Sequence, residues 1–150
     1  MFYIIGILML ISDQISKYYA VKLLQGHEPY VILENYLQLN YVENFGAAFG
    51  ILQNKQLFFI ILTTLVIIGI LIYIKFNTKL SKPMTLALVM VVFGALGNLI
   101  DRIRLGYVID FIDVKFGNFY DFPVFNFADS FIVIATIIIM YLILFEKYEV

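Results

Sequence analysis

The side chains of this sequence that could do chemistry are mainly carboxylates. The chain has no cysteine and one histidine, His27, which excludes thiol chemistry and disfavours a zinc site, because catalytic zinc normally draws on several His or Cys ligands. No serine lies in the sequence context of a nucleophile elbow. Asp129, in contrast, is set near the start of the apolar run FPVFNFADSFIVIATIIIMYLILF, residues 122–145. Two carboxyl groups held close together share a proton and can activate water. Asp129 is therefore a candidate for one half of an aspartic dyad, with no metal and no cofactor expected.

The elements that must position this carboxylate are predicted to be membrane-spanning helices. The chain has 150 residues, of which 63% are hydrophobic and 14% charged, and its mean hydropathy is +0.94, far outside the usage of soluble domains. A bilayer core about 30 Å thick requires about 20 mostly apolar residues per helix. Such runs predict a membrane α-helical fold with four transmembrane helices, at about residues 2–21, 57–74, 84–100 and 123–145. Because no repeat or linker interrupts the chain, residues 1–150 are expected to form a single domain.

The distribution of basic residues predicts how these helices cross the membrane. The short connection after the second helix carries Lys75, Lys79 and Lys82 and no acid, so the positive-inside rule assigns it to the cytoplasm. Both termini are then cytoplasmic. The two long connections, residues 25–56 and 101–122, lie on the outer side.

The outer connections are predicted to form a small extracytoplasmic β-sheet. Residues 30–42, YVILENYLQLNYV, alternate apolar and polar side chains with a period of two, which is typical of a half-buried strand. The second connection supplies VIDFIDVKFGNFYDF, residues 108–122, rich in aromatic and β-branched residues. Such a sheet could cradle an extended peptide as an additional strand, or it could simply cap the helix bundle. Periodicity alone leaves both alternatives open.

Polar side chains of the helices are expected to meet near the outer membrane surface. Asp13 and Lys17 are four residues apart, which places acid and base on one helix face and predicts an ion pair. A charge deep in a bilayer costs at least about 2.5–3.5 kcal/mol, so a common depth indicates a shared site. Interhelical hydrogen bonds alone would explain several of these residues. They leave Asp110 and Asp129 unexplained, because acids outnumber the bases at this level. The residues expected at this depth are Asp13, Lys17, Asn98, Asp101, Arg102, Asn126 and Asp129.

Five short motifs, in this order, resemble those of the lipoprotein signal peptidases, also called signal peptidase II. They are DQISK (13–17), NFGAAF (44–49), GALGNLIDR (94–102), VIDF (108–111) and FNFADS (125–130). Each motif alone is a weak signal. Together, at plausible spacing and in the predicted topology, they are a specific one, and the resemblance covers nearly the whole chain.

The resemblance implies roles for individual residues. Asp110 in VIDF and Asp129 in FNFADS correspond to the catalytic pair of the family. Gly94 would permit close helix approach or ligand access. The residues expected to bind substrate or support the site are Asp13, Lys17, Asn44, Gly46, Gly94, Asn98, Arg102 and Asn126.

The resemblance also implies a function. Members of this family are aspartic endopeptidases of the bacterial cell membrane, with the active site at the outer face. They remove the signal peptide from diacylglyceryl-modified prolipoproteins by cutting N-terminal to the lipidated cysteine. The expected partners are these prolipoproteins and membrane lipids, with no nucleic acid, and the expected state is a monomer.

Two alternative functions make different demands on the sequence. A small proton-coupled membrane transporter subunit would need a relay of titratable groups across the bilayer, whereas the inner halves of the predicted helices carry almost none. A scaffold without chemistry would tolerate charge-neutral substitutions at Asp110 and Asp129.

Overall fold

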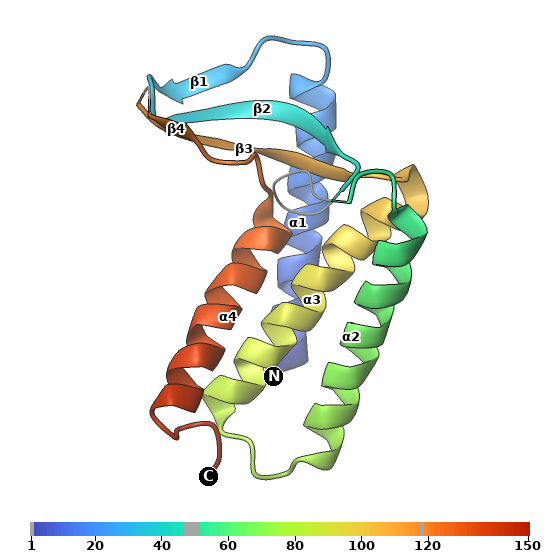
Figure 1. Ribbon diagram of the computed structural model, residues 1–150, viewed down its shortest axis with the longest axis vertical. Helices are drawn as coiled ribbons and strands as arrows, with labels where there is room; N and C mark the ends of the chain where they lie inside the picture. The colour runs from blue at the N-terminus through green and yellow to red at the C-terminus, as the bar shows by residue number, and fades with distance from the viewer. Residues whose placement is uncertain (1, 47–51, 118) are drawn as a thin grey trace.

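The computed structural model describes residues 2–46, 52–117 and 119–150. In these ranges the chain forms a bundle of long helices with an antiparallel sheet across one end (Figure 1). The elements are α1 (Phe2–Leu24), β1 (Tyr30–Leu33), β2 (Leu37–Asn44), α2 (Gln56–Phe76), α3 (Lys82–Leu105), β3 (Val108–Phe116), β4 (Tyr120–Asp121) and α4 (Phe127–Leu144).

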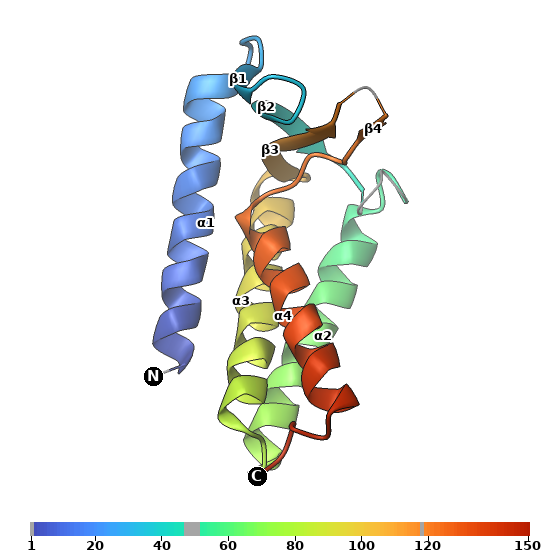
Figure 2. The same cartoon turned by 90° about the vertical axis from the view of Figure 1, so that its left-hand side faces the viewer.

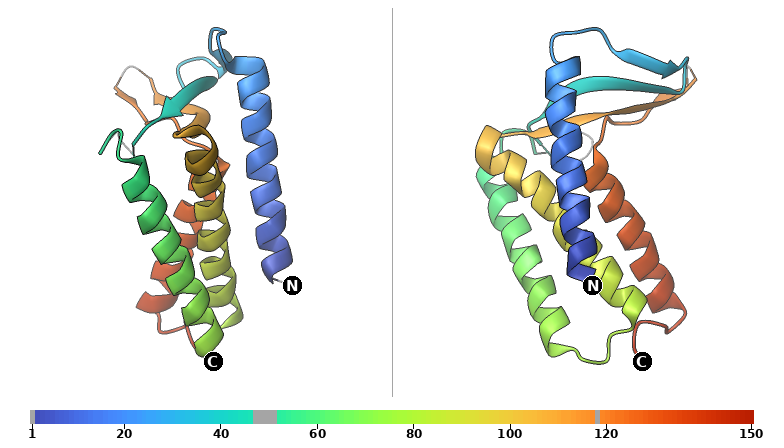
Figure 3. Two further views of the ribbon diagram at one scale, coloured as in Figure 1. Left: turned by 90° about the vertical axis from the view of Figure 1, so that its right-hand side faces the viewer. Right: turned by 180° about the vertical axis from the view of Figure 1, so that it is seen from behind.

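The helices have the length and composition of membrane spans, which confirms the predicted fold class. All four are long and apolar enough to cross a bilayer. The helix α3 contacts each of the other three helices, and Figures 2 and 3 show it in the interior of the bundle with α1 on one face. It accordingly contains most of the buried helical residues, whereas only Phe59 and Ile67 are buried along α2. Ile60, Ile70 and Ile74 also pack against the core, while most of the other apolar side chains of α2 are exposed, as expected for a helix in contact with lipid.

Of the helix boundaries that differ from the sequence prediction, two determine where site residues lie. The helix α3 continues beyond residue 100 to Leu105 and ends where Gly106 adopts a left-handed conformation with φ of 81°. Asp101 and Arg102 therefore belong to the last turns of α3 and not to the outer connection. Helices commonly end in this way because glycine adopts positive φ without steric cost.

The helix α4 begins at Phe127, four residues after the predicted start at 123. Asn126 is its N-cap and accepts a hydrogen bond from the backbone N–H of Asp129, while the Asp129 side chain accepts from the backbone N–H of Asn126. This reciprocal capping box satisfies two of the free N–H groups at the helix start. The preceding Phe125 instead pairs with Ile112 of β3, so this part of the apolar run is extended.

The sheet has the order β1-β2-β3-β4, with all neighbours antiparallel. It lies at the end of the bundle opposite to both chain termini (Figure 1). The prediction of one strand over residues 30–42 was wrong, because the segment folds into a hairpin at Asn35, which has a φ of 63°. Asparagine tolerates this left-handed conformation better than most residues. The apolar residues Val31 and Leu33 before the turn have the same two-residue phase as Leu37 and Leu39 after it, which concealed the turn in the sequence.

Candidate active site

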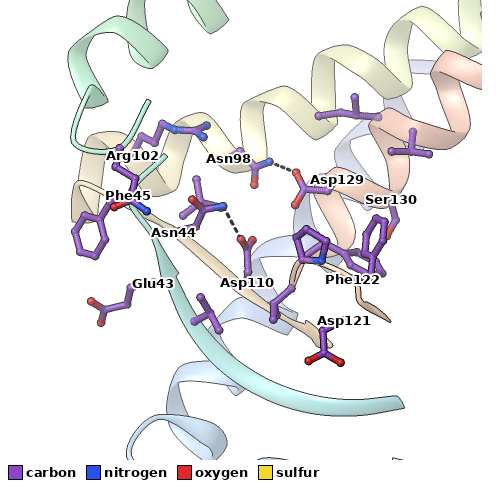
Figure 4. Close-up of a pocket in the computed structure, with 18 of the residues that line it drawn as sticks. Glu43, Asn44, Phe45, Asn98, Arg102, Asp110, Asp121, Phe122, Asp129 and Ser130 are labelled. Atoms are coloured by element: carbon purple, nitrogen blue, oxygen red, sulfur yellow. Dashed lines mark hydrogen bonds between the residues drawn. The ribbon is translucent and has the colours of Figure 1, made fainter. Parts of the chain in front are cut away.

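A pocket of about 1060 Å³ lies where the sheet meets the adjoining ends of α3 and α4. Asp110 enters it from β3 and Asp129 from the first turn of α4 (Figure 4). Further polar lining comes from Asn44 at the end of β2 and from Asn98 and Arg102 of α3. Elements from separate parts of the chain thus place both carboxylates in one cavity.

Asp110 is a buried carboxylate held by two amides. The Asn44 Nδ2 donates to its Oδ2 at 2.9 Å and the Asn126 Nδ2 donates to its Oδ1 at 2.6 Å. Asn44 is itself oriented by the Gly46 N–H, which donates to Asn44 Oδ1 at 2.9 Å. Burial, followed by the negative charge of Asp129, raises the pKa of Asp110 to about 7, while the two amide hydrogen bonds oppose the rise. Asp110 is therefore poised to gain or lose a proton near neutral pH.

Asp129 receives a matching pair of hydrogen bonds. The Asn98 Nδ2 donates to its Oδ1 at 2.7 Å, and the backbone N–H of Asn126 donates to its Oδ2 at 3.3 Å. Asn126 is fully buried and contacts both carboxylates, one through its side chain and the other through its backbone. It fixes the strand-borne Asp110 and the helix-borne Asp129 relative to each other.

The expected Asp13–Lys17 ion pair is present, but it is part of a larger cluster. The Lys17 Nζ lies 3.0 Å from Asp13 Oδ2 and 2.8 Å from Asp101 Oδ2, and only 2% of the Lys17 side chain is exposed. The role of Asp101 as the second partner was missed from the sequence. Its position three residues after Asn98, on the same face of α3, was the available signal.

The two carboxylates bound to Lys17 also hold the backbone next to the pocket aspartates. Asp13 Oδ1 accepts from the Ala128 N–H at 2.9 Å, one residue before Asp129. Asp101 Oδ2 accepts from the Ile109 N–H at 3.3 Å, one residue before Asp110. The cluster therefore ties α1 and α3 to the two elements that carry the candidate dyad.

Lys17 also orients Asn98. The Asn98 Oδ1 accepts from Lys17 Nζ at 2.9 Å and from Asn126 Nδ2 at 3.1 Å. Because the amide oxygen is occupied by these donors, its Nδ2 faces Asp129. Removal of the ammonium would weaken this orientation.

Gly94 and Gly97 contribute space, and the structure assigns it to helix packing. A Cβ at Gly94 would lie 2.8 Å from the Ala128 carbonyl oxygen and 2.9 Å from Ile132 Cγ1. A Cβ at Gly97 would lie 2.5 Å from Asp13 Oδ2. Of the two roles expected for Gly94, close helix approach is the one observed, since α4 fills the space that ligand access would need.

A family model described as Signal peptidase (SPase) II matches residues 5–145. The chain belongs to the signal peptidase II family. A lipoprotein signal peptidase of Caldanaerobacter subterraneus is 52% identical over 136 residues, which are 89% of each chain. That of Halothermothrix orenii is 42% identical over 148 residues, which are 98% of each chain.

Solved structures agree with this family membership. A bacterial membrane enzyme determined by the in meso method at 2.3 Å superposes with a TM-score of 0.89, at 35% identity, over 96% of this chain and 87% of the other. A second bacterial membrane enzyme superposes with a TM-score of 0.84 at 36% identity. The chain is therefore a membrane peptidase of a bacterial signal peptidase family, and nothing in these matches supports a transporter.

The signal peptidase II motifs meet around the pocket to different degrees. Asn44, Asn98 and Asn126 contact the two aspartates directly. Gly46 acts through its backbone, since its carbonyl oxygen accepts from Arg102 Nη2 at 3.1 Å. Residues 47–49 of the NFGAAF motif lie outside the described residues.

Proposed function

We propose that this member of the signal peptidase II family is an aspartic endopeptidase, with Asp110 and Asp129 as its catalytic pair. It would remove the signal peptide from diacylglyceryl-modified prolipoproteins by cutting N-terminal to the lipidated cysteine. The observation that carries the proposal is the bridging of the two carboxylates by Asn126 in one pocket. The negative charge of Asp129 also raises the pKa of Asp110, so the two carboxyl groups cannot both ionise cheaply and the pair can hold one proton.

This arrangement supports the chemistry of water activation. One aspartate, ionised, accepts a proton from a water molecule as the water oxygen attacks the scissile carbonyl carbon. The other, protonated, donates to the carbonyl oxygen as negative charge develops on it. When the tetrahedral intermediate collapses, the C–N bond breaks and the cysteine nitrogen takes the proton that the first aspartate received from water. The second aspartate recovers its proton from a hydroxyl group of the intermediate. The amides of Asn44, Asn98 and Asn126 keep the carboxylates in place throughout.

The depth of the pocket fits a lipid-anchored substrate. Asp129 lies in the first turn of α4, at the end of the helix next to the sheet. The helix α4 has 18 residues, and at about 1.5 Å per residue it spans most of a bilayer core. Ile132, Val133 and Ile134 continue the pocket lining along α4. A scissile bond next to a diacylglyceryl cysteine would be held at this depth by its acyl chains, while the apolar signal helix lies against the bundle.

The charge distribution supports an outward-facing site. Lys75, Lys79 and Lys82 lie around the connection between α2 and α3, at the end of the bundle opposite to the sheet (Figure 1). By the positive-inside rule this end, with both termini, is cytoplasmic and the sheet is outside. Because the two aspartates and the amides that orient them are bonded to one another within a single chain, we expect a monomer to be active.

The decisive experiment compares two precursors. The purified protein is incubated with a diacylglyceryl-modified prolipoprotein and with the same precursor lacking the lipid, and the products are identified by mass. We expect cleavage before the cysteine of the modified precursor only. Asp113→Asn is a matched control, because Asp113 is a buried aspartate of β3 that is bonded to Gln38 and does not line the pocket. Loss of activity in Asp113→Asn but not in Asp110→Asn would refute the assignment.

A further inference from the structure

Arg102 is the basic side chain in a pocket that is otherwise rich in acids. The described lining residues include the carboxylates of Glu43, Asp110, Asp121 and Asp129, with Arg102 as the single Lys or Arg. In Figure 4 its side chain extends from α3 over the pocket, on the same side as Asn98. Among the described lining residues, Arg102 is therefore the one charged group that would attract a ligand with negative charge.

The guanidinium of Arg102 has no direct ion pair among the described residues. Among the described residues, no carboxylate lies within ion-pair distance of it, since the ion pairs found there belong to Lys17. The undescribed positions, 1, 47–51 and 118, include no Asp or Glu. The oxygens of Asp110 and Asp129 are instead bonded by neutral amides. The positive charge therefore remains available to a ligand.

The hydrogen-bond donors of Arg102 are also incompletely used. Its Nη2 donates to the Gly46 carbonyl, and the Phe59 ring centroid lies 5.0 Å from Cζ. Its Nε is buried and has no partner in the described part of the chain. An unsatisfied buried donor is costly, and a small turn of the guanidinium toward an anion would satisfy it.

The proposed reaction creates such an anion in this pocket. The scissile amide is neutral, but hydrolysis adds the water oxygen to the carbonyl carbon and breaks the C–N bond. The signal peptide then ends in a carboxylic acid, which loses its proton to become a carboxylate, while the cysteine gains an amino group. The carboxylate forms beside a dyad that is itself negatively charged.

We infer that Arg102 binds the new C-terminal carboxylate of the cleaved signal peptide. This inference rests on the proposed function. Arg102 draws the carboxylate away from the dyad, which frees Asp110 and Asp129 for the next water molecule. It also makes the released signal peptide a product inhibitor whose binding depends on its charged end. Arginine suits this role because its planar fork matches a carboxylate with two parallel hydrogen bonds.

The test compares two forms of the product. A prolipoprotein signal peptide that ends just before the cysteine is synthesised with a free C-terminal carboxylate and with a C-terminal amide. Both are measured as inhibitors of diacylglyceryl-prolipoprotein cleavage by the intact protein in detergent micelles. Because a hydrogen bond to a charged group is stronger than a neutral one, we expect the acid to bind about 10-fold to 100-fold more tightly than the amide.

Variants assign the difference to Arg102. In Arg102→Gln the acid and amide should bind alike, whereas Arg102→Lys should keep part of the preference through its charge. Lys55→Gln is the control for general electrostatics, because Lys55 is an exposed base beside α2 that does not line the pocket. It should retain the full preference for the acid.

The outcomes separate this inference from the proposed function. Equal inhibition by acid and amide, in a protein that cleaves the lipidated precursor, would overturn the inference and leave the peptidase assignment intact. A preference for the acid that persists in Arg102→Gln would overturn it as well. Failure to cleave any lipidated precursor would overturn the proposed function. The comparison of acid and amide in the unmodified protein needs no variant, so it stands even where Arg102→Gln does not fold.

Discussion

Replacement of Asp110 by Asn should abolish cleavage and change the pH dependence of stability. The buried Asp110 has its pKa raised to about 7, against an ordinary value of about 3.9. A group whose pKa is raised in the folded state stabilises the fold fully below its unfolded pKa, and this contribution is lost as the pH rises through the folded pKa. For a rise of about three units the loss amounts to roughly 4 kcal/mol between about pH 4 and pH 7. Asn does not ionise, so the variant avoids this loss.

The variant has a cost of its own, which does not depend on pH. The Oδ1 of Asn44 accepts from Gly46 and the Oδ1 of Asn126 accepts from Asp129, so both neighbouring amides present their NH2 groups to residue 110. An Asn there would place its own NH2 against one of these donors, at a cost of roughly 1–3 kcal/mol. We therefore expect Asp110→Asn to be more stable than the unmodified protein at pH 8, by about 1–3 kcal/mol. Near pH 5 it should be equal or less stable.

Thermal unfolding in detergent micelles, followed by circular dichroism at several pH values, measures this crossover. For a chain of this size, 1 kcal/mol corresponds to a shift in Tm of about 2–4 °C, so the change between pH 5 and pH 8 should be several degrees. Asp113→Asn again serves as control and should retain activity. If the Tm difference between Asp110→Asn and the unmodified protein is the same at pH 5 and pH 8, the argument from the raised pKa of Asp110 is refuted.

Three further predictions address the rest of the site. Asp129→Asn should insert and fold but leave the lipidated precursor uncut, and normal processing, read by mass, would remove this residue from the mechanism. Lys17→Met leaves two buried carboxylates without their cation and should cost about 3–5 kcal/mol in stability. Adding Asp101→Asn should restore part of the lost Tm. If the double variant shows no recovery, the proposed stabilising role of the ion-pair cluster is contradicted. Gly94→Ala should lower both Tm and activity because the new Cβ pushes α4 away from α3. Gly69→Ala is the control and should be neutral or stabilising, because nothing lies within 4 Å of its new Cβ. Equal effects of the two substitutions would contradict the packing role of Gly94.

Hydropathy, periodicity and motifs predicted the four spans, the presence of an outer sheet and the family, although not every boundary. Hydropathy reveals a transmembrane helix because lipid offers the backbone no hydrogen bonds, so each apolar run must satisfy its own. The five motifs identified the family, and they placed Asp110 and Asp129 among residues that the structure does bring together. That these two aspartates catalyse the reaction is our proposal, and the predictions above test it.

Other features depended on contacts between distant segments. Lys17 has a second ion-pair partner, Asp101, on another helix. The sequence prediction missed it because i to i+4 spacing reveals only the partner within the same helix, Asp13. The sequence prediction misplaced the start of α4 because the apolar run from residue 122 continues without a break in hydropathy. The helix begins where it does because Asn126 and Asp129 form a capping box and Phe125 pairs with β3.

The role of each small or charged residue was likewise decided by its neighbours in space. Gly94 was consistent with either ligand access or helix packing until the backbone of α4 was found against it. Arg102 reads in sequence as one more charge beside Asp101, yet Asp101 bonds Lys17 and leaves the guanidinium without an acid. Hydropathy and periodicity are properties of a local segment, whereas pairing and burial depend on how segments pack, so only the tertiary structure shows which charge remains unpaired.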